Sequence, residues 1–542
     1  MRNSTRVTVL FGLAAVLWLT IVLAGYYYVH KPIQPSQGLP LARLALTLIG
    51  WLATLALAAG IGRAILPFLS DLSRREAIAL QMGLGLGVLG LFVLALGAVG
   101  GYRPWIAWAA LIGGLIAFRR TVRSTVAELR AAVPRWPATG ANRALAIFVG
   151  LTLALAFLRA LAPPTAWDAL VYHLTGPALY IASGGIHHSI DIPYLGFPQW
   201  PEMLFTWAML LGSANGAALF HFTFAVLTLC LVPGLTRTHA SGRGWLVWAI
   251  LVAIPTAALL ASWAYVEWFT MFAVTASFFA IAQWQGQEAN ERKWLALAGA
   301  FAGLGFAAKY TTLGAVLGLG LLVLFWAGRE RFVRAALTFG LAAALVALPW
   351  LIKTLALTGN PIYPFIFAGK YWDAYRSTWY SQPGTGLRGL ALLIAPWTAT
   401  VWGVEGGSPY GADIGPMFLG LIPFIFLGWR ERSQASRRLL IGALIVVGAA
   451  YAAWIAQLAL SRLLAQTRLL LPVFPLLAVF AAIAFDNLKI VTSPRFAARW
   501  VVGASIALAL ALNATGQILS FAADSPLPVV VGAQSEADYL TS

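Results

Sequence analysis

Long apolar runs recur along the chain from residue 8 to residue 520, and short polar segments separate them. A helix needs about 20 apolar residues to cross the hydrocarbon core of a membrane. The runs are continuous and do not alternate with polar positions, which excludes a membrane β-barrel. The pattern therefore predicts an all-α polytopic membrane protein with about 13–15 helices.

Two long segments, 163–202 and 353–412, interrupt the apolar runs and are rich in aromatic, Pro and Gly residues. We expect both to be ordered loops that carry function. Inside the second, "LRGLALLIAPWTATVW" predicts an apolar helix that lies in the membrane interface. The chain then divides into three parts, which are four N-terminal spans in 1–143, a core with both loops in 144–485, and a last span with a short tail in 486–542.

The charge is strongly positive, with 36 Lys and Arg against 18 Asp and Glu. The positive residues lie in short clusters between apolar runs, such as "FRRTVRSTVAELRAAVPRW" and "GRERFVR", and form no single patch, so nucleic acid is not expected as a partner. Such clusters face the cytoplasm. Alternation of the spans predicts a multi-pass protein of the plasma membrane with a cytoplasmic N-terminus. Both long loops and the tail from residue 521 are then external.

An aspartate stands at the rim of an apolar run in "PPTAWDALVYHLTGPALY". Thr165 and Asp168 fit a helix-capping pattern, which gives the carboxylate a structural role. A catalytic role is the alternative, and the two are compatible. If the segment is helical, Asp168 and Tyr172 share a face and His173 lies to one side. Asp168 is then placed to act as a base next to a substrate pocket.

The same loop holds further ionisable residues in "IHHSIDIPYLGFPQWPEMLF". Glu202 follows Pro201 at an expected helix start, where an anion is favoured with or without a catalytic role. Asp191 is a candidate for the substrate pocket. A divalent metal stays open, because no spacing among the candidate ligands is diagnostic. Those candidates are His173, His187, His188, Asp191 and Glu202.

Three more ionisable residues lie at outer rims of apolar runs. Glu267 stands in the turn "SWAYVEWF", Lys309 with Tyr310 at the tip of a hairpin in "GFAAKYTTL", and Arg468 before "LLLPVFP". A hydroxyl that attacks a lipid-phosphate sugar needs one carboxylate base, and the leaving phosphate needs cations. A glycosidase needs two paired carboxylates. The set therefore favours sugar transfer, provided that these residues converge.

The order of "WDALVYHLTGPALYIASGGI", "FPQWPEMLFTWAMLLG", "AYVEWF", "GFAAKYTTL", "LPWLIKTLALTGNPIYPF" and "TRLLLPVFPLLAVFAAIAFD" resembles the GT-C glycosyltransferases. These include the RgtA/B/C/D-like enzymes, the protein O-mannosyltransferases and the aminoarabinose transferase of lipid A. The resemblance covers roughly residues 144–540. It implies a GT-C-like bundle that uses a polyprenyl-phosphate sugar and inverts the anomeric carbon.

The resemblance also implies roles. Asp168 matches the acidic base of the first external loop, and Glu267 matches a later acidic position and is a further catalytic candidate. Lys309 and Tyr310 of the "KY" turn and Arg468 would hold the donor phosphate. The chain departs from the family in having Ala169 where many relatives have a second acid, in its four extra N-terminal spans and in its short tail.

Other functions fit the same composition. A flippase or transporter of a lipid-linked glycan is one, an oligosaccharide polymerase or ligase is another, and an inactive scaffold is a third. A transporter would place ionisable groups in mid-helix, whereas those of this chain gather at one rim. The sequence identifies neither the sugar nor the acceptor, which is a lipid, a glycan or a protein.

Overall fold

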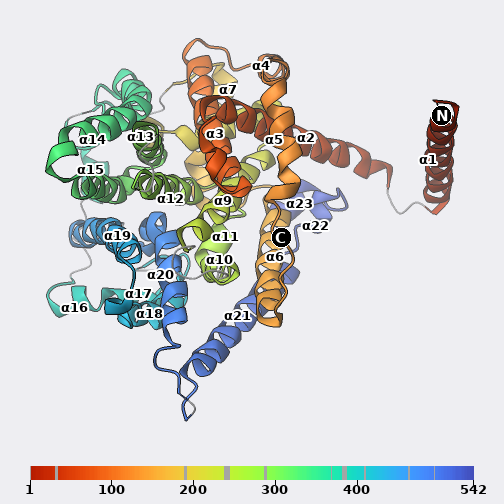
Figure 1. Cartoon of the computed structure of the whole chain (residues 1–542). Coiled ribbons are helices and arrows are strands. Elements are labelled where there is room, and N and C mark those ends of the chain that lie inside the picture. Colours follow the sequence, from red (N-terminus) through yellow and green to blue (C-terminus); the bar gives the residue numbers. More distant parts are fainter. Residues whose placement is uncertain are drawn as a thin grey trace.

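The fold is known from a computed structural model, which describes residues 2–30, 34–187, 192–236, 244–285, 290–367, 369–380, 387–407, 410–461, 464–493 and 495–541. These residues form helices and no strand, apart from one isolated bridge between Ser493 and Phe496. The all-α membrane fold expected from the apolar runs is confirmed (Figure 1). Asp191 and His188 lie outside the described residues.

The α-helices follow in this order: α1 Arg2–His30, α2 Gly38–Ile65, α3 Arg74–Ala98, α4 Pro104–Ala117, α5 Arg119–Ala132, α6 Gly140–Ala160, α7 Thr175–Ser183, α8 Trp200–Leu211, α9 Asn215–Thr236, α10 Gly244–Val252, α11 Pro255–Leu260, α12 Glu267–Trp284, α13 Glu291–Ala308, α14 Leu313–Thr358, α15 Ala374–Tyr380, α16 Leu390–Leu393, α17 Ala395–Trp402, α18 Met417–Leu421, α19 Gln434–Leu460, α20 Phe474–Asn487, α21 Ala498–Ala523, α22 Leu527–Val530 and α23 Glu536–Thr541.

Nine helices in the described part of the chain are long and apolar enough to cross a membrane, or ten if the bent pair of α4 and α5 is one span. Three of our expected spans explain part of the difference from the predicted number. The expected spans 311–327 and 333–352 are two arms of α14. The expected span 245–262 is divided between α10 and α11, because Pro255 ends one helix and begins the next.

Helix α14 folds back on itself at Gly328. This residue has a φ of 66°, a conformation that glycine adopts at no steric cost. The ring of Phe339 on the second arm lies within 3.9 Å of the position that a Cβ of Gly320 would take on the first arm. The two arms therefore run antiparallel.

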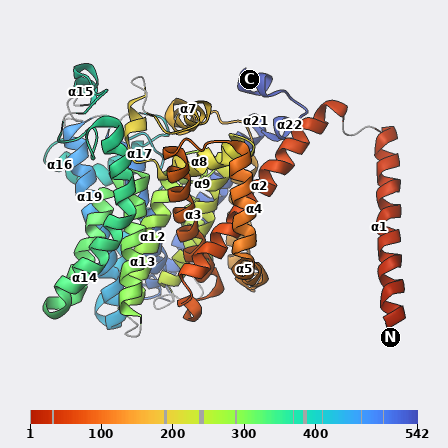
Figure 2. The ribbon, with the colours of Figure 1, turned by 90° about the horizontal axis from the view of Figure 1, so that it is seen from above.

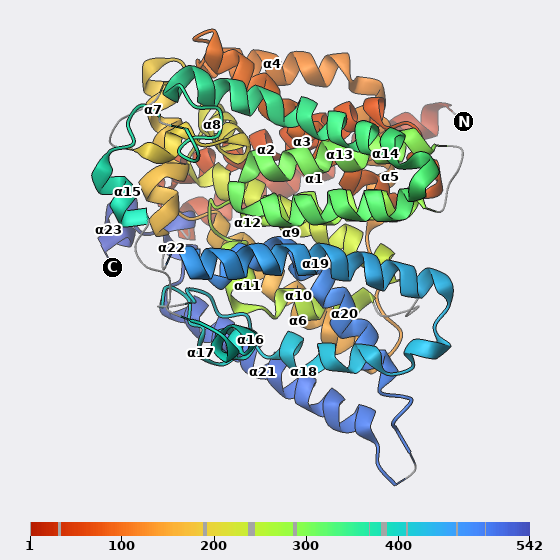
Figure 3. The ribbon, with the colours of Figure 1, turned by 90° about the vertical axis from the view of Figure 1, so that its left-hand side faces the viewer.

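Helix α13 packs closely on the second arm of α14, and Figure 3 shows the two in one layer with α12. A Cβ at Gly303 would lie 2.4 Å from the carbonyl oxygen of Ala343, so only glycine allows this approach. Glu291, at the start of α13, pairs with Arg331 just after the turn of α14 at 3.3 Å. The other end of α13 leads to Lys309, which this packing holds in place.

The two ends of the helix bundle differ in composition (Figure 2). One end, which we call the loop end, carries α7, α15 and α17. The opposite end carries the arginine-rich α5 and, by its pairing with the start of α13, the polar turn of α14. We call it the basic end. The division of the chain into three parts stays a prediction.

The C-terminal segment returns to the start of the bundle. Helix α21 packs along α6 (Figure 1), and the tail then reaches the beginning of α2. There the Gln37 side-chain amide donates a hydrogen bond to the carbonyl of Val531 at 2.9 Å. The tail therefore belongs to the folded protein at the loop end.

Candidate active site

The loop between α6 and α8 begins with one turn of π-helix, Ala169–His173, directly after Asp168. The amide of Leu174 donates to the carbonyl of Ala169 at 2.9 Å, which is the i to i+5 bond of such a turn. The capping interpretation of Thr165 and Asp168 is wrong, because no hydrogen bond joins these two described residues. The carboxylate is directed to another part of the chain.

Asp168 forms an ion pair with Arg468, which lies 300 positions later in the sequence. Its Oδ2 accepts a hydrogen bond from Nη2 of Arg468 at 2.8 Å, and each side chain is 16% exposed. Tyr265 supports both partners. Its hydroxyl accepts the backbone N–H of Asp168 at 3.0 Å, and its ring lies 5.8 Å from the guanidinium carbon of Arg468. Burial raises the pKa of Tyr265, so its hydroxyl stays neutral.

A second ion pair joins Glu267, the first residue of α12, to Lys309, the residue after α13. Nζ of Lys309 donates to Oε1 of Glu267 at 2.8 Å. Glu267 is buried, and Lys309 keeps 22% of its side chain exposed. The Arg468 guanidinium is also close enough to Glu267 for electrostatic attraction. Glu267 therefore lies between two cations, and the two ion pairs form one cluster.

His221 on α9 fixes the segment that holds Tyr265 and Glu267. Its Nδ1 lies 2.8 Å from the carbonyl of Trp263, and its Nε2 accepts the backbone N–H of Trp268 at 2.8 Å. Since Nε2 is the acceptor, the proton is on Nδ1 and donates to the carbonyl. This histidine is fully buried and was not singled out in the sequence. The signal was a single histidine in an apolar run.

Glu202 and His173 form a buried pair beside the cluster. Nδ1 of His173 lies 2.6 Å from Oε1 of Glu202, while Oε2 of Glu202 has no hydrogen-bond partner in the described chain. The ring of Tyr172 lies 4.1 Å from His173 and 4.4 Å from Tyr194, measured between centroids. Tyr172 also interacts electrostatically with Asp168, so the pair of Glu202 and His173 lies close to Asp168.

The other candidates have separate surroundings. The ring of Tyr310 lies among Phe197, Phe306 and Phe365. Nδ1 of His187 lies 3.1 Å from the hydroxyl of Ser183. Within the described ranges, no three His, Cys, Asp or Glu side chains gather as metal ligands. No ligand set for a divalent metal can therefore be named from these residues.

Two ionisable residues near the cluster were missed in the sequence. Oε2 of Glu405 accepts a hydrogen bond from the hydroxyl of Thr256 at 2.5 Å, and burial raises the pKa of this carboxyl. Lys353, near the end of α14, is buried and donates to the carbonyls of Leu195 and Phe197 at 2.6 and 2.7 Å, and to Gln199. It thereby anchors the segment before Glu202. Lys353 was noticeable as a lysine with apolar neighbours, whereas Glu405 lies in a loop without a pattern.

Two solved structures are similar to this chain. One is ArnT from Cupriavidus metallidurans bound to undecaprenyl phosphate, with 14% identity, coverage of 73% of this chain and 75% of that chain, and a TM-score of 0.46. The other is the same protein in the apo state, with 15% identity, coverage of 73% and 74%, and a TM-score of 0.44. No family model matches the sequence, and no curated protein matches it. The roles of the site residues therefore rest on their own geometry.

Proposed function

We propose that the protein is a membrane glycosyltransferase, which moves a sugar from a polyprenyl-phosphate donor to an acceptor hydroxyl with inversion at the anomeric carbon. One observation carries the proposal. At the loop end, a carboxylate with little exposure, Asp168, is in contact with Arg468, and a second cation, Lys309, lies next to it through Glu267. A base and two cations in one cluster are what this reaction requires.

In the proposed step, Asp168 takes the proton of the acceptor hydroxyl while the oxygen attacks the anomeric carbon. The new carbon–oxygen bond forms as the bond from that carbon to the phosphate oxygen breaks. The electron pair of the broken bond stays on the phosphate, where Arg468 and Lys309 stabilise the added charge. No second carboxylic acid is needed, because the phosphate is a weak base.

The ion pairs also suggest the order in which the two substrates bind, with the donor before the acceptor. A donor phosphate that takes the guanidinium of Arg468 replaces the carboxylate of Asp168 as its partner. The carboxylate then has no cation beside it and is free to accept the proton of the acceptor hydroxyl. Donor binding thus prepares the base for the acceptor.

The remaining carboxylates act through their neighbours. Glu267 positions Lys309 by the 2.8 Å contact, and His221 holds the turn before Glu267. Glu202 positions His173 in the turn that follows Asp168. The ring of Tyr172 lies between Tyr194 and His173, and we propose that it lines the substrate pocket.

The protein is placed in the plasma membrane with its basic end in the cytoplasm and its loop end outside. The support is the arginine content of α5 and of the turn of α14, both at the basic end. With this orientation the N-terminus is cytoplasmic and the sugar is transferred on the external face. The sugar is left open, as is the acceptor, whether a lipid, a glycan or a protein.

The test is transfer from radiolabelled polyprenyl-phosphate hexoses and pentoses to added lipid, glycan or protein acceptors in proteoliposomes, with and without added divalent metal. We expect Asp168→Asn to lower the transfer rate by about 100- to 10,000-fold, the usual contribution of a general base. Donor binding, measured with polyprenyl phosphate alone, should stay within a few-fold of the original, because both cations are kept.

The matched control is Asp373→Asn, which removes an exposed, ion-paired aspartate at the start of α15 in the other long loop. It should transfer sugar at the normal rate. If Asp168→Asn transfers sugar as fast as this control, Asp168 is not the base. If the wild-type protein moves intact lipid-linked sugar across the bilayer without breaking the glycosidic bond, the protein is a transporter.

A further inference from the structure

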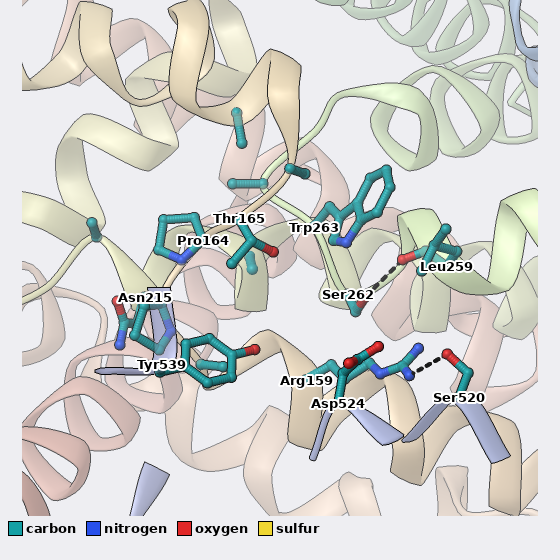
Figure 4. A pocket seen from close by; sticks show the side chains of 17 residues that line it. Arg159, Pro164, Thr165, Asn215, Leu259, Ser262, Trp263, Ser520, Asp524 and Tyr539 are labelled. Carbon is teal, nitrogen blue, oxygen red and sulfur yellow. Dashed lines mark hydrogen bonds between the residues drawn. The ribbon is translucent and has the colours of Figure 1, made fainter. Parts of the chain in front are cut away.

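A cavity of about 190 Å³ lies behind the segment that leads to Asp168 (Figure 4). The end of α6, Pro163 to Ala166, the start of α9, the turn before α12 and the C-terminal tail enclose it. Asp168, Glu267, Lys309 and Arg468 are not among its lining residues. It is therefore a second site, separate from the ion-pair cluster, with the segment from Pro163 to Ala169 as one wall.

The cavity carries one positive and one negative side chain that do not bond to each other. Nη2 of Arg159 donates to the hydroxyl of Ser520 at 2.8 Å, and the guanidinium lies over the ring of Phe521 at 5.7 Å, so the cation is held in place. The carboxylate of Asp524 takes part in no hydrogen bond or ion pair with any residue the structure describes. It is near enough to Arg159 to interact electrostatically. Figure 4 shows both at the same rim of the cavity.

Neutral hydrogen-bonding groups complete the lining. The hydroxyls of Thr165, Ser262 and Tyr539 and the side-chain amide of Asn215 belong to it. Ser262 donates its own proton to the carbonyl of Leu259 at 2.7 Å, which leaves its oxygen as an acceptor. A small, polar and dipolar ligand suits such a lining better than an apolar chain does.

The position along the helices points to lipid. Arg159 is the last residue but one of α6, and Asp524 directly follows α21. Protein covers only 28% of the apolar window of α6 and 11% of that of α21, so lipid surrounds the outer faces of both helices. The ends of such spans lie where hydrocarbon gives way to headgroups. The cavity therefore opens at headgroup depth on the loop end.

We propose that this cavity binds the headgroup of a phospholipid with a primary amine. Arg159 holds the phosphate, and Asp524 accepts hydrogen bonds from the ammonium group. A water molecule occupies about 30 Å³, so the cavity has room for a group of roughly six such volumes. An anionic glycerol headgroup would leave Asp524 without a cation, and a quaternary amine would offer it no N–H donor. The proposal does not depend on the transferase activity.

The test uses native mass spectrometry of the full-length protein in detergent, with dioleoyl phosphatidylethanolamine, phosphatidylglycerol or phosphatidylcholine added singly. We expect the ethanolamine lipid to bind about tenfold more tightly than the other two, the effect of one charge-assisted hydrogen bond. Asp524→Asn should remove this preference, while Asp524→Glu should keep most of it. Arg159→Gln should weaken the binding of all three lipids.

Two variants serve as controls at the same end of the molecule. Asp538→Asn changes a carboxylate on α23 outside the cavity, and Arg43→Gln changes an exposed arginine near the start of α2, next to the tail. Both should bind lipids as the wild type does. The proposal is overturned if the wild type binds the three lipids equally, or if Asp524→Asn keeps its preference for the ethanolamine lipid while eluting as a single folded species.

Discussion

The loop end and the basic end of the bundle use ion pairs in different ways. At the loop end, Lys309 meets Glu267 at 2.8 Å, with 22% and 4% of their side chains exposed. At the basic end, Arg331 meets Glu291 at 3.3 Å, and the arginine is 55% exposed. Exposed pairs contribute about 0–1 kcal/mol, whereas loss of one partner of a buried pair costs about 3–5 kcal/mol. The contrast teaches that buried charged side chains indicate the candidate active site, whereas the number of positive residues at one end indicates which end faces the cytoplasm.

The strongest way to break this comparison is Arg468→Gln. The change removes the cation from Asp168 and one phosphate contact at once. We expect single-turnover transfer at saturating donor to fall by about 100- to 1,000-fold, as when a donor to a developing negative charge is lost. Arg388→Gln, an exposed arginine at the loop end, is the control. A loss under threefold would show that Arg468 stabilises no leaving group.

Lys309→Ala should give the next largest effect. A hydrogen bond to a charged group contributes about 1.5–3 kcal/mol, so the KM for donor should rise about 10- to 100-fold. Lys293→Ala is the matched change on the same helix at the basic end, where the ammonium lies 5.4 Å over the ring of Phe68. Its donor KM should not change. Equal effects of the two variants would remove the distinction between the ends.

A packing change sharpens the comparison, because the position of Lys309 depends on how α13 packs against α14. Gly303→Leu pushes a side chain against the carbonyl of Ala343 and should lower the free energy of unfolding by about 1–3 kcal/mol. Unfolding in mixed detergent and dodecyl sulfate measures this change. Gly340→Leu on α14 meets no atom within 4 Å and serves as the control. Equal stability of both variants would contradict the close packing of α13 on α14.

The smallest effect is expected at the basic end. Arg331→Gln breaks an exposed pair with Glu291, so the free energy of unfolding should change by less than about 1 kcal/mol. The transfer rate should be unchanged. Unfolding in mixed detergent and dodecyl sulfate measures the stability, and single-turnover transfer measures the rate. A loss of activity comparable to that of Lys309→Ala would show that the basic end takes part in the reaction.

Much of the fold could be predicted, because membrane helices must be apolar along their length. The two arms of α14 were visible in the sequence, since the polar "GRERFVR" between them has to leave the hydrocarbon. Pro255 is a residue that breaks helices, but the run around it is apolar throughout, so we predicted a single span there. The number of spans was harder to predict, because the run 245–262 forms two buried helices, α10 and α11, each shorter than a span.

The individual residues of the site could be predicted, but not which of them contact each other. Asp168 and Arg468 each stood out as an ionisable group beside apolar sequence, yet no pattern links positions 300 apart. Their contact comes from the packing of the loop on the turn before α12. His221 and Glu405 were missed for the same reason. His221 bonds to the backbone carbonyl of Trp263 and the backbone N–H of Trp268, and Glu405 bonds to a threonine hydroxyl. None of these partners leaves a signal in the sequence.

The π-helical turn after Asp168 makes the chain sensitive to length at this point. An ordinary α-helical turn closes its hydrogen bond one residue sooner, so deletion of a single residue from Ala169–His173 would let the segment relax into regular helix. The π turn already accommodates the extra residue, so the helix beyond the deletion would keep its orientation and the change would be confined to the turn itself. The turn thus carries one surplus residue after Asp168, and a deletion there would change which side chains lie beside the carboxylate without turning helix α7.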